Sequence, residues 1–128
     1  MKIGTARNAV MAVSLLGFSL GIGSNALADD YIDGFEAAAR GDYKKAAAVW
    51  FDLAKKGNPD AQFNLAQAYH SGVAGSYNEP EALKWYMKAA NAGHQRAQEY
   101  LVVGYREGWF GLPKDQKKSH FWEAKLNP

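Results

Sequence analysis

The sequence predicts an all-α protein, a right-handed α-solenoid of about three antiparallel helix pairs. Three observations indicate this fold class. Two stretches of the chain repeat each other with a period of 36 residues, apolar residues recur every fourth position within them, and glycines or helix-capping residues separate the segments. Periods between about 20 and 50 residues are typical of stacked units, none of which buries its apolar face alone. A binding scaffold is therefore expected rather than a catalyst.

The repeat consists of eight pairs of matching positions in one register. The first half of the unit matches Ala61, Leu65, Tyr69 and Gly72 to Ala97, Leu101, Tyr105 and Gly108. The second half matches Ala46, Trp50, Ala54 and Gly57 to Ala82, Tyr86, Ala90 and Gly93. The four-residue spacing of the apolar members places each set on one face of a helix.

We expect six helices, over residues 30–40, 43–56, 59–71, 79–92, 95–107 and 115–126. Gly41-Asp42 ends the first helix and starts the second, because glycine accepts the left-handed conformation that closes a helix and aspartate caps the next. Gly57 closes the second helix, and Asn58-Pro59-Asp60 opens the third with a cap, a first-turn proline and an acid. Asn78-Glu79-Pro80-Glu81 opens the fourth in the same way, and Gly93 closes it. The fifth helix follows from the 36-residue repeat of the third.

Small and large apolar residues are expected at different places in the packing of the helices. Alanine lets helix axes approach closely on the inner faces, at positions Ala46, Ala54, Ala61, Ala82, Ala89, Ala90 and Ala97. Large aromatics are expected to fill the gaps between neighbouring helix pairs, at Trp50, Trp85, Tyr86, Phe121 and Trp122. In the sixth helix Lys118 and Lys125 replace the alanines of the preceding unit, which suits a terminal helix with one solvated face. Phe121 and Trp122 either close the third pair or offer an adhesive end to a partner.

The motifs in these units resemble the Sel-one-like repeat, a relative of the tetratricopeptide repeat. The resemblance lies in the strings AQFNLAQAYHSGVAG, EALKWYMKAANAG and RAQEYLVVGYREGWFGLPKD, and it covers roughly residues 34–126. Two departures are Ala66 and Val102, which stand where the family usually has glycine. The resemblance implies a solenoid of helix pairs and a role in protein interaction, but it identifies no partner.

Residues 1–28 are expected to be a cleaved export signal. Lys2 and Arg7 precede an apolar run, and the run leads to Ala26-Leu27-Ala28, a small-x-small pattern typical of signal peptidase sites. We expect cleavage between Ala28 and Asp29 and a periplasmic or secreted protein that is not embedded in the membrane. An uncleaved anchor is the alternative, although the run is shorter than the ~20 residues that a bilayer span needs.

The mature chain is expected to be one repeat domain over residues 29–128, with units of about 30–57, 58–93 and 94–128. Removing the two cations of the signal lowers the net charge from +2 to zero, so there is no basic patch for nucleic acid. The chain has no cysteine, which excludes disulfides and cysteine metal sites. Because about three hairpins make a short stack, its ends could pair with another copy of the chain.

A concave groove lined by the first helix of each pair is the predicted binding site, since this arrangement is implied by the resemblance. The candidate residues combine aromatic, amide and arginine side chains, which suit an extended peptide or protein segment. They are Phe63, Asn64, Gln67 and His70, their equivalents Glu99, Tyr100, Val103 and Arg106, and Tyr31, Phe35 and Ala38 from the first helix. An ordinary solvated surface with a few tolerated aromatics is the alternative.

A second candidate contact is the loop that contains Trp109 and Phe110, two bulky aromatics between glycines. They either fold back over the hairpin junction, the slightly favoured alternative, or stay exposed as a contact with a partner or the envelope.

The residues give no pattern for catalysis, a metal or another cofactor. His70, His94 and His120 are 24 and 26 residues apart, whereas a zinc site needs at least three converging ligands. The acidic pairs are explained by helix ends and solvated faces, and no phosphate loop or nucleophile elbow is present. We therefore expect a non-enzymatic protein that binds another protein or peptide. The alternative is an accessory subunit of a cell-wall or polysaccharide enzyme complex whose aromatics also stack on glycan.

Overall fold

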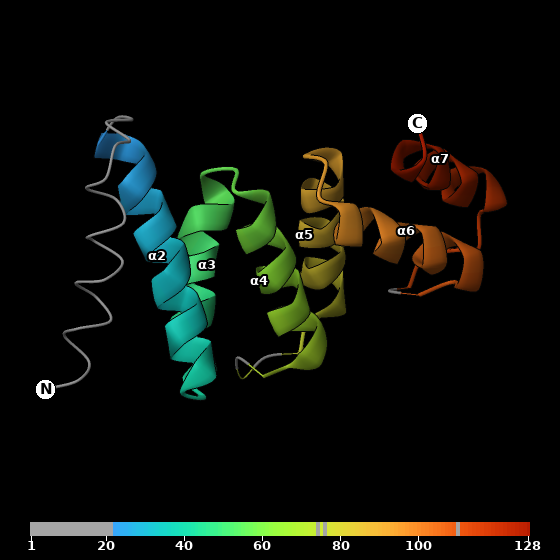
Figure 1. The fold of residues 1–128 in the computed structure, drawn as a ribbon. Coiled ribbons are helices and arrows are strands. Elements are labelled where there is room, and N and C mark those ends of the chain that lie inside the picture. Colours follow the sequence, from blue (N-terminus) through green and yellow to red (C-terminus); the bar gives the residue numbers. More distant parts are fainter. Residues whose placement is uncertain (1–21, 74, 76, 110) are drawn as a thin grey trace, which may run out of the picture.

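The structure, a computed structural model, describes residues 22–128 except residues 74, 76 and 110. Its helices follow one another along an elongated stack (Figure 1), and no strand occurs among the described residues. They are α2 (Ile22–Ala39), α3 (Tyr43–Lys55), α4 (Pro59–Ser71), α5 (Glu79–Asn91), α6 (Gln95–Glu107) and α7 (Gln116–Leu126). The predicted all-α fold and its six helices are confirmed, and every bound except the start of α2 agrees within one residue.

Helix α2 begins at Ile22, earlier than the predicted start at residue 30. The preceding sequence contains the good helix formers Ala26, Leu27 and Ala28, so nothing local stops the helix at residue 30. The predicted cleavage point after Ala28 lies within this helix, whereas residues 1–21 of the predicted export signal lie outside the described residues. Tyr31 is the first described side chain of α2 that packs against the core.

The predicted helix boundaries are made by the expected side chains. Asp42, Asn58 and Asn78 each accept a hydrogen bond from the backbone amide three residues later, at 3.0 to 3.1 Å. These bonds satisfy amides that have no partner within the helix. Gly57 and Gly93 close α3 and α5 with φ of +94° and +89°, a conformation that favours glycine.

The helices pack as three consecutive hairpins, α2 on α3, α4 on α5 and α6 on α7, and each hairpin also packs on the next. All seven predicted inner alanines are buried. Four of the five predicted gap-filling aromatics are also buried, namely Trp50, Trp85, Tyr86 and Trp122. Phe121 does not fill such a gap and is 54% exposed, as in the expected alternative of an exposed end, because no further hairpin follows α7 among the described residues.

Buried glutamines join consecutive hairpins. Gln62 on α4 donates its Nε2 hydrogen to the carbonyl oxygen of Ala54 at 3.1 Å, and Gln98 on α6 makes the equivalent bond to Ala90 at 3.0 Å. Both acceptors lie in the last turn of a helix, and each also accepts a hydrogen bond of 3.0 Å from the amide of the glycine that closes that helix, Gly57 or Gly93. The sequence analysis did not single out these residues, although they occupy matching positions of the repeat.

An aromatic cluster fills the space between the second and third hairpins. The rings of Tyr86 and Tyr100 stack with centroids 4.9 Å apart, and Phe63 lies 5.7 Å from each of them. Tyr86 is fully buried, and this burial, aided by the neighbouring Tyr100, raises the pKa of its hydroxyl. The cluster therefore links α4, α5 and α6 through one apolar contact.

Among the residues that the structure describes, no helix has both the length and the apolar character needed to cross a membrane.

Candidate functional site

A groove of about 630 Å³ lies on the side of the stack formed by α2, α4 and the start of α6. Five of the residues expected on the concave face, all from α2 and α4, lie together in this groove. The turn between α5 and α6 closes the groove at its other side. The lining consists of Tyr31, Phe35, Asp60, Phe63, Asn64, Gln67, Gly93, His94, Gln95 and Arg96.

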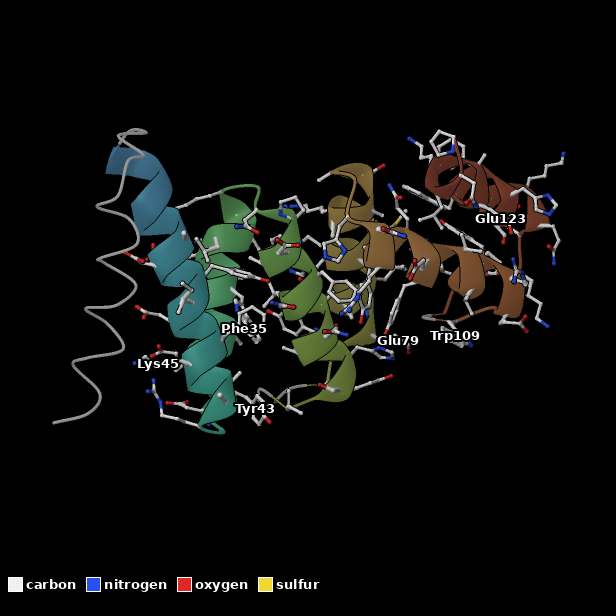
Figure 2. All side chains as sticks on the ribbon, in the orientation of Figure 1. Phe35, Tyr43, Lys45, Glu79, Trp109 and Glu123 are labelled. Atoms are coloured by element: carbon white, nitrogen blue, oxygen red, sulfur yellow. The ribbon has the colours of Figure 1, made fainter. Side chains whose placement is uncertain are left out.

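Helix α2 supplies an aromatic wall. Tyr31 and Phe35 are one helical turn apart, with ring centroids 5.0 Å apart in an edge-to-face arrangement. Phe35 also contacts the indole of Trp50 at 5.9 Å, yet it remains 49% exposed on the groove side (Figure 2). Half of a large apolar ring is thus fixed in place and still available to a ligand.

The hydroxyl of Tyr31 is held across the groove by Asn64 of α4, whose Nδ2 donates a hydrogen bond to it at 3.1 Å. Partial burial raises the pKa of Tyr31, the nearby carboxylate of Asp60 raises it further, and the Asn64 bond opposes the shift. The hydroxyl therefore keeps its proton, which it can donate to an acceptor in the groove.

His94 forms part of the floor and caps helix α6. Its Nδ1 accepts a hydrogen bond from the amide of Ala97 at 3.2 Å, and its Nε2 lies 3.2 Å from a carboxylate oxygen of Asp60. An accepting Nδ1 requires the ring proton on Nε2, which is thus donated to Asp60. The ring also stacks on Phe63 at 4.5 Å. His94 therefore joins the start of α6 to the start of α4.

Two polar side chains of the groove are open to a ligand. Gln67 is exposed, and so is Arg96, whose guanidinium makes no ion pair with any described residue within 4.0 Å. Asn64 also lines the groove. The groove thus combines a half-exposed ring, amide groups and one cation, but the described residues contain no cluster of three or more potential metal ligands.

The sequence analysis missed Asp60, His94, Gln95 and Arg96, because it considered faces further along the first helices and not the caps and first turns where these residues lie. One signal could have found His94. It stands one 36-residue period after the capping residue Asn58 and serves the same purpose.

The remaining predicted groove residues do not line this groove. Among them, Tyr100 is half-buried against Tyr86, and Arg106 pairs with Glu123 of α7 at 3.6 Å. Tyr100 thus faces α5 and Arg106 faces α7, so these positions of α6 do not continue the groove. The others are Glu99, which is exposed and accepts a hydrogen bond from Gln95, and Ala38, His70 and Val103, which are half-buried.

Phe63 does line the groove but is only 3% exposed. The analysis placed it in the groove as a ligand contact, whereas the structure makes it the buried floor on which His94 stacks. Phe63 therefore supports the floor of the groove by packing under the His94 ring.

The aromatic loop lies away from the groove. Trp109 is 47% exposed, while its backbone amide donates a hydrogen bond to the carbonyl of Gly104 at 2.9 Å. The loop backbone is therefore anchored and the indole is half-exposed. This state is intermediate between a ring folded back over the hairpin junction and a fully exposed ring. Phe110 lies outside the described residues.

A second, more apolar hollow of about 460 Å³ lies between α3 and α4. Phe51 is 38% exposed at this hollow, and Tyr69 contributes from α4. Tyr69, which the repeat places on the apolar face of its helix, is partly buried against the core beside this hollow.

No protein-family model matches the chain. Among solved structures, the chain is similar to the crystal structure of a Sel1 repeat protein from Oxalobacter formigenes, with a TM-score of 0.69 and 22% sequence identity. The match covers 84% of this chain and 90% of that protein. At this identity the likeness establishes the fold, and it agrees with the repeat motifs in the sequence. The chain thus shares the fold of a Sel1 repeat protein, an all-α solenoid of helical hairpins.

Proposed function

We propose that the chain is a non-enzymatic interaction protein that binds an extended segment of a partner protein in the groove between α2, α4 and the start of α6. The observation that carries this proposal is the half-exposed ring of Phe35 beside the amides of Asn64 and Gln67. Fixed aromatic rings are the commonest energetic centres of protein interfaces, and side-chain amides pair well with peptide backbone.

The shape of the groove favours a segment over a small molecule. Its walls come from three helical elements, so an occupant has to extend from α2 across α4 to reach Arg96. A chain in an extended conformation spans about 3.3 Å per residue, so a few residues are enough to meet both the aromatic wall and the guanidinium. Protein interaction is also the role that is typical of helical repeat scaffolds.

We further propose that the protein works in the periplasm or outside the cell, after removal of residues 1–28. The support is the sequence of that segment, with two early cations, an apolar run and Ala26-Leu27-Ala28 before the cut. N-terminal sequencing of the protein recovered from its cell should begin at Asp29. A start near Met1 would contradict the proposed export.

Site-specific photocrosslinking in the producing cell tests the groove. A photoreactive residue at Gln67 should give a discrete protein adduct that mass spectrometry identifies, whereas the same residue at exposed Lys45 on α3 should not. Phe35→Ala should then weaken binding of that partner at least about tenfold. Phe51→Ala is the matched control, because Phe51 is a similarly exposed ring at the other hollow.

Equal adducts from both positions, or unchanged partner affinity in a folded Phe35→Ala variant, would refute the groove as the binding site. Purified peptidoglycan fragments serve as the competing ligand class, since Phe35 beside Asp60 and Asn64 also suits a sugar ring. Glycan binding that is lost in Phe35→Ala, without a protein adduct, would favour the accessory-subunit alternative.

A further inference from the structure

The two ends of the helix stack carry exposed faces of opposite charge. At the first end is α2, and at the other is α7 (Figure 1). On α2, residues 29, 32, 33 and 36 follow the spacing of one helix face and are all exposed. This α2 face consists of Asp29, Ile32, Asp33 and Glu36, with Ile32 43% exposed at its centre. Arg40, the residue directly after α2, lies 3.8 Å from Glu36.

The α7 face has the complementary composition. Residues 117, 121, 124 and 125 also follow one helix face and are all exposed. This face consists of Lys117, Phe121, Ala124 and Lys125, with Phe121 54% exposed and Lys125 above its ring at 5.0 Å. The single carboxylate of α7, Glu123, pairs instead with Arg106 of α6 (Figure 2).

Polar end faces are expected in any solenoid, because the terminal units must stay in solution. That requirement explains the charges, but it explains neither their opposite signs nor the large apolar residue at the centre of each face. Ile32 and Phe121 are each surrounded by charges of one sign. An apolar centre with a charged rim is the usual composition of a protein interface.

We propose that copies of this chain associate head to tail, the α7 face of one copy packing on the α2 face of the next. Phe121 and Ala124 would lie against Ile32, while Lys117 and Lys125 would face Asp33 and Glu36. The contact continues the arrangement within the chain, where the second helix of each hairpin packs on the first helix of the next. It uses no groove residue, so it is independent of the proposed partner site.

This type of contact is heterologous, because each copy uses two different surfaces. Such contacts do not close at two copies, so they produce chains of copies unless the rotation between copies happens to close a ring. Two helix faces of about three turns each would bury an area at the low end of the range known for protein interfaces, which predicts weak association. Its charged rim predicts that association weakens as salt is added.

Sedimentation analysis of the purified protein tests the proposal over about 10 to 1,000 μM, the range expected for a weak contact. The mass should rise beyond two copies with concentration and fall with added salt. Reversing charges on either face, by Lys117→Glu with Lys125→Glu or by Asp33→Lys with Glu36→Lys, should weaken association more than about tenfold. Lys45→Glu with Lys56→Glu, exposed on α3 and its end, is the matched control and should associate like the parent.

Mixing the two reversed variants gives the decisive result. The first has two acidic ends and the second has two basic ends, so only the mixture can form complementary contacts and recover the parental mass. A monomer at every concentration, a dimer that no reversal affects, or a mixture that fails to recover would each overturn the proposal. The intact mass of the same sample reports separately whether residues 1–28 have been removed, and circular dichroism reports that each variant is folded.

Discussion

Gln98 donates a hydrogen bond of 3.0 Å to the carbonyl of Ala90, across the junction between the second and third hairpins. The equivalent bond, from Gln62 to Ala54, crosses the junction between the first and second hairpins. Each of these carbonyls also accepts the amide of the glycine that closes its helix, at 3.0 Å, so the glutamine uses the second lone pair of the oxygen. One glutamine per repeat therefore connects the end of one hairpin to the start of the next.

Replacing Gln98 by leucine should lower the free energy of unfolding by about 1–2 kcal/mol, because a buried hydrogen bond is lost. Urea denaturation measures the change. Gln95→Ala on the same helix is the control, since Gln95 is exposed, and it should change stability by less than about 0.5 kcal/mol. Equal stability of the two variants would mean that the Gln98 bond contributes nothing to the junction.

Gly34→Ala should destabilise the first hairpin although alanine favours helix more than glycine. A Cβ at this position would lie 2.5 Å from Nε1 of Trp50, whose indole is buried between α2 and α3. We expect a net loss of about 1–2 kcal/mol, because overpacking outweighs the gain in helix propensity. A double-mutant cycle with Trp50→Phe should show a smaller loss, since the smaller ring leaves room for the methyl group. The same loss in both backgrounds would rule out the steric explanation.

His94→Ala should cost about 1–2 kcal/mol, because it removes the cap of α6 together with the contacts to Asp60 and Phe63. His94→Asn should cost less, because asparagine already caps α4 at the matching position, Asn58. Thermal unfolding of the two variants gives the comparison. If the asparagine variant were as unstable as the alanine variant, the cap would not be the source of the effect.

Raising the pH above about 10 should destabilise the protein. Burial raises the pKa of Tyr86 in the folded state, so the unfolded chain loses this proton first as the pH rises. The unfolded state then binds fewer protons than the folded state, and the free energy of unfolding falls with increasing pH. Denaturant titrations at several pH values measure the slope. Tyr86→Phe should make the slope shallower, and an unchanged slope would show that another group is responsible.

Tyr100→Ala should reduce stability by about 1–3 kcal/mol, because Tyr100 stacks on buried Tyr86 and contacts Phe63. Arg106→Ala should have an effect below about 1 kcal/mol, since its ion pair with Glu123 is about half exposed. Calorimetry distinguishes the two. A fully stable Tyr100→Ala variant would contradict a packing role for this ring and would favour its assignment as a groove residue.

The sequence predicted the helices well because their signals are local. Capping residues, helix-closing glycines and the four-residue spacing of alanines each act within a few positions, and Asp42, Asn58, Asn78, Gly57 and Gly93 all act as expected. The repeat then indicated which faces meet. The early start of α2 was missed because no local stop signal separates Ala28 from Tyr31.

The candidate site was predicted less completely because it depends on how the hairpins meet. The groove faces of α2 and α4 were identified, including Tyr31, Phe35 and Asn64. The expected continuation along α6 failed because the rotation of α6 depends on its packing with α5 and α7, which periodicity alone does not specify. Arg96 was missed because it lies in the first turn of α6, one period after Asp60, and neither position was considered as part of the groove.

The aromatic cluster of Phe63, Tyr86 and Tyr100 has a consequence for how the protein unfolds. Its rings come from three helices of two hairpins, and His94 binds Asp60 across the same junction. Neither hairpin can open alone without exposing a ring that the other covers. We therefore expect α4, α5 and α6 to exchange their amide hydrogens as one cooperative unit, while the helices at both termini exchange earlier by fraying.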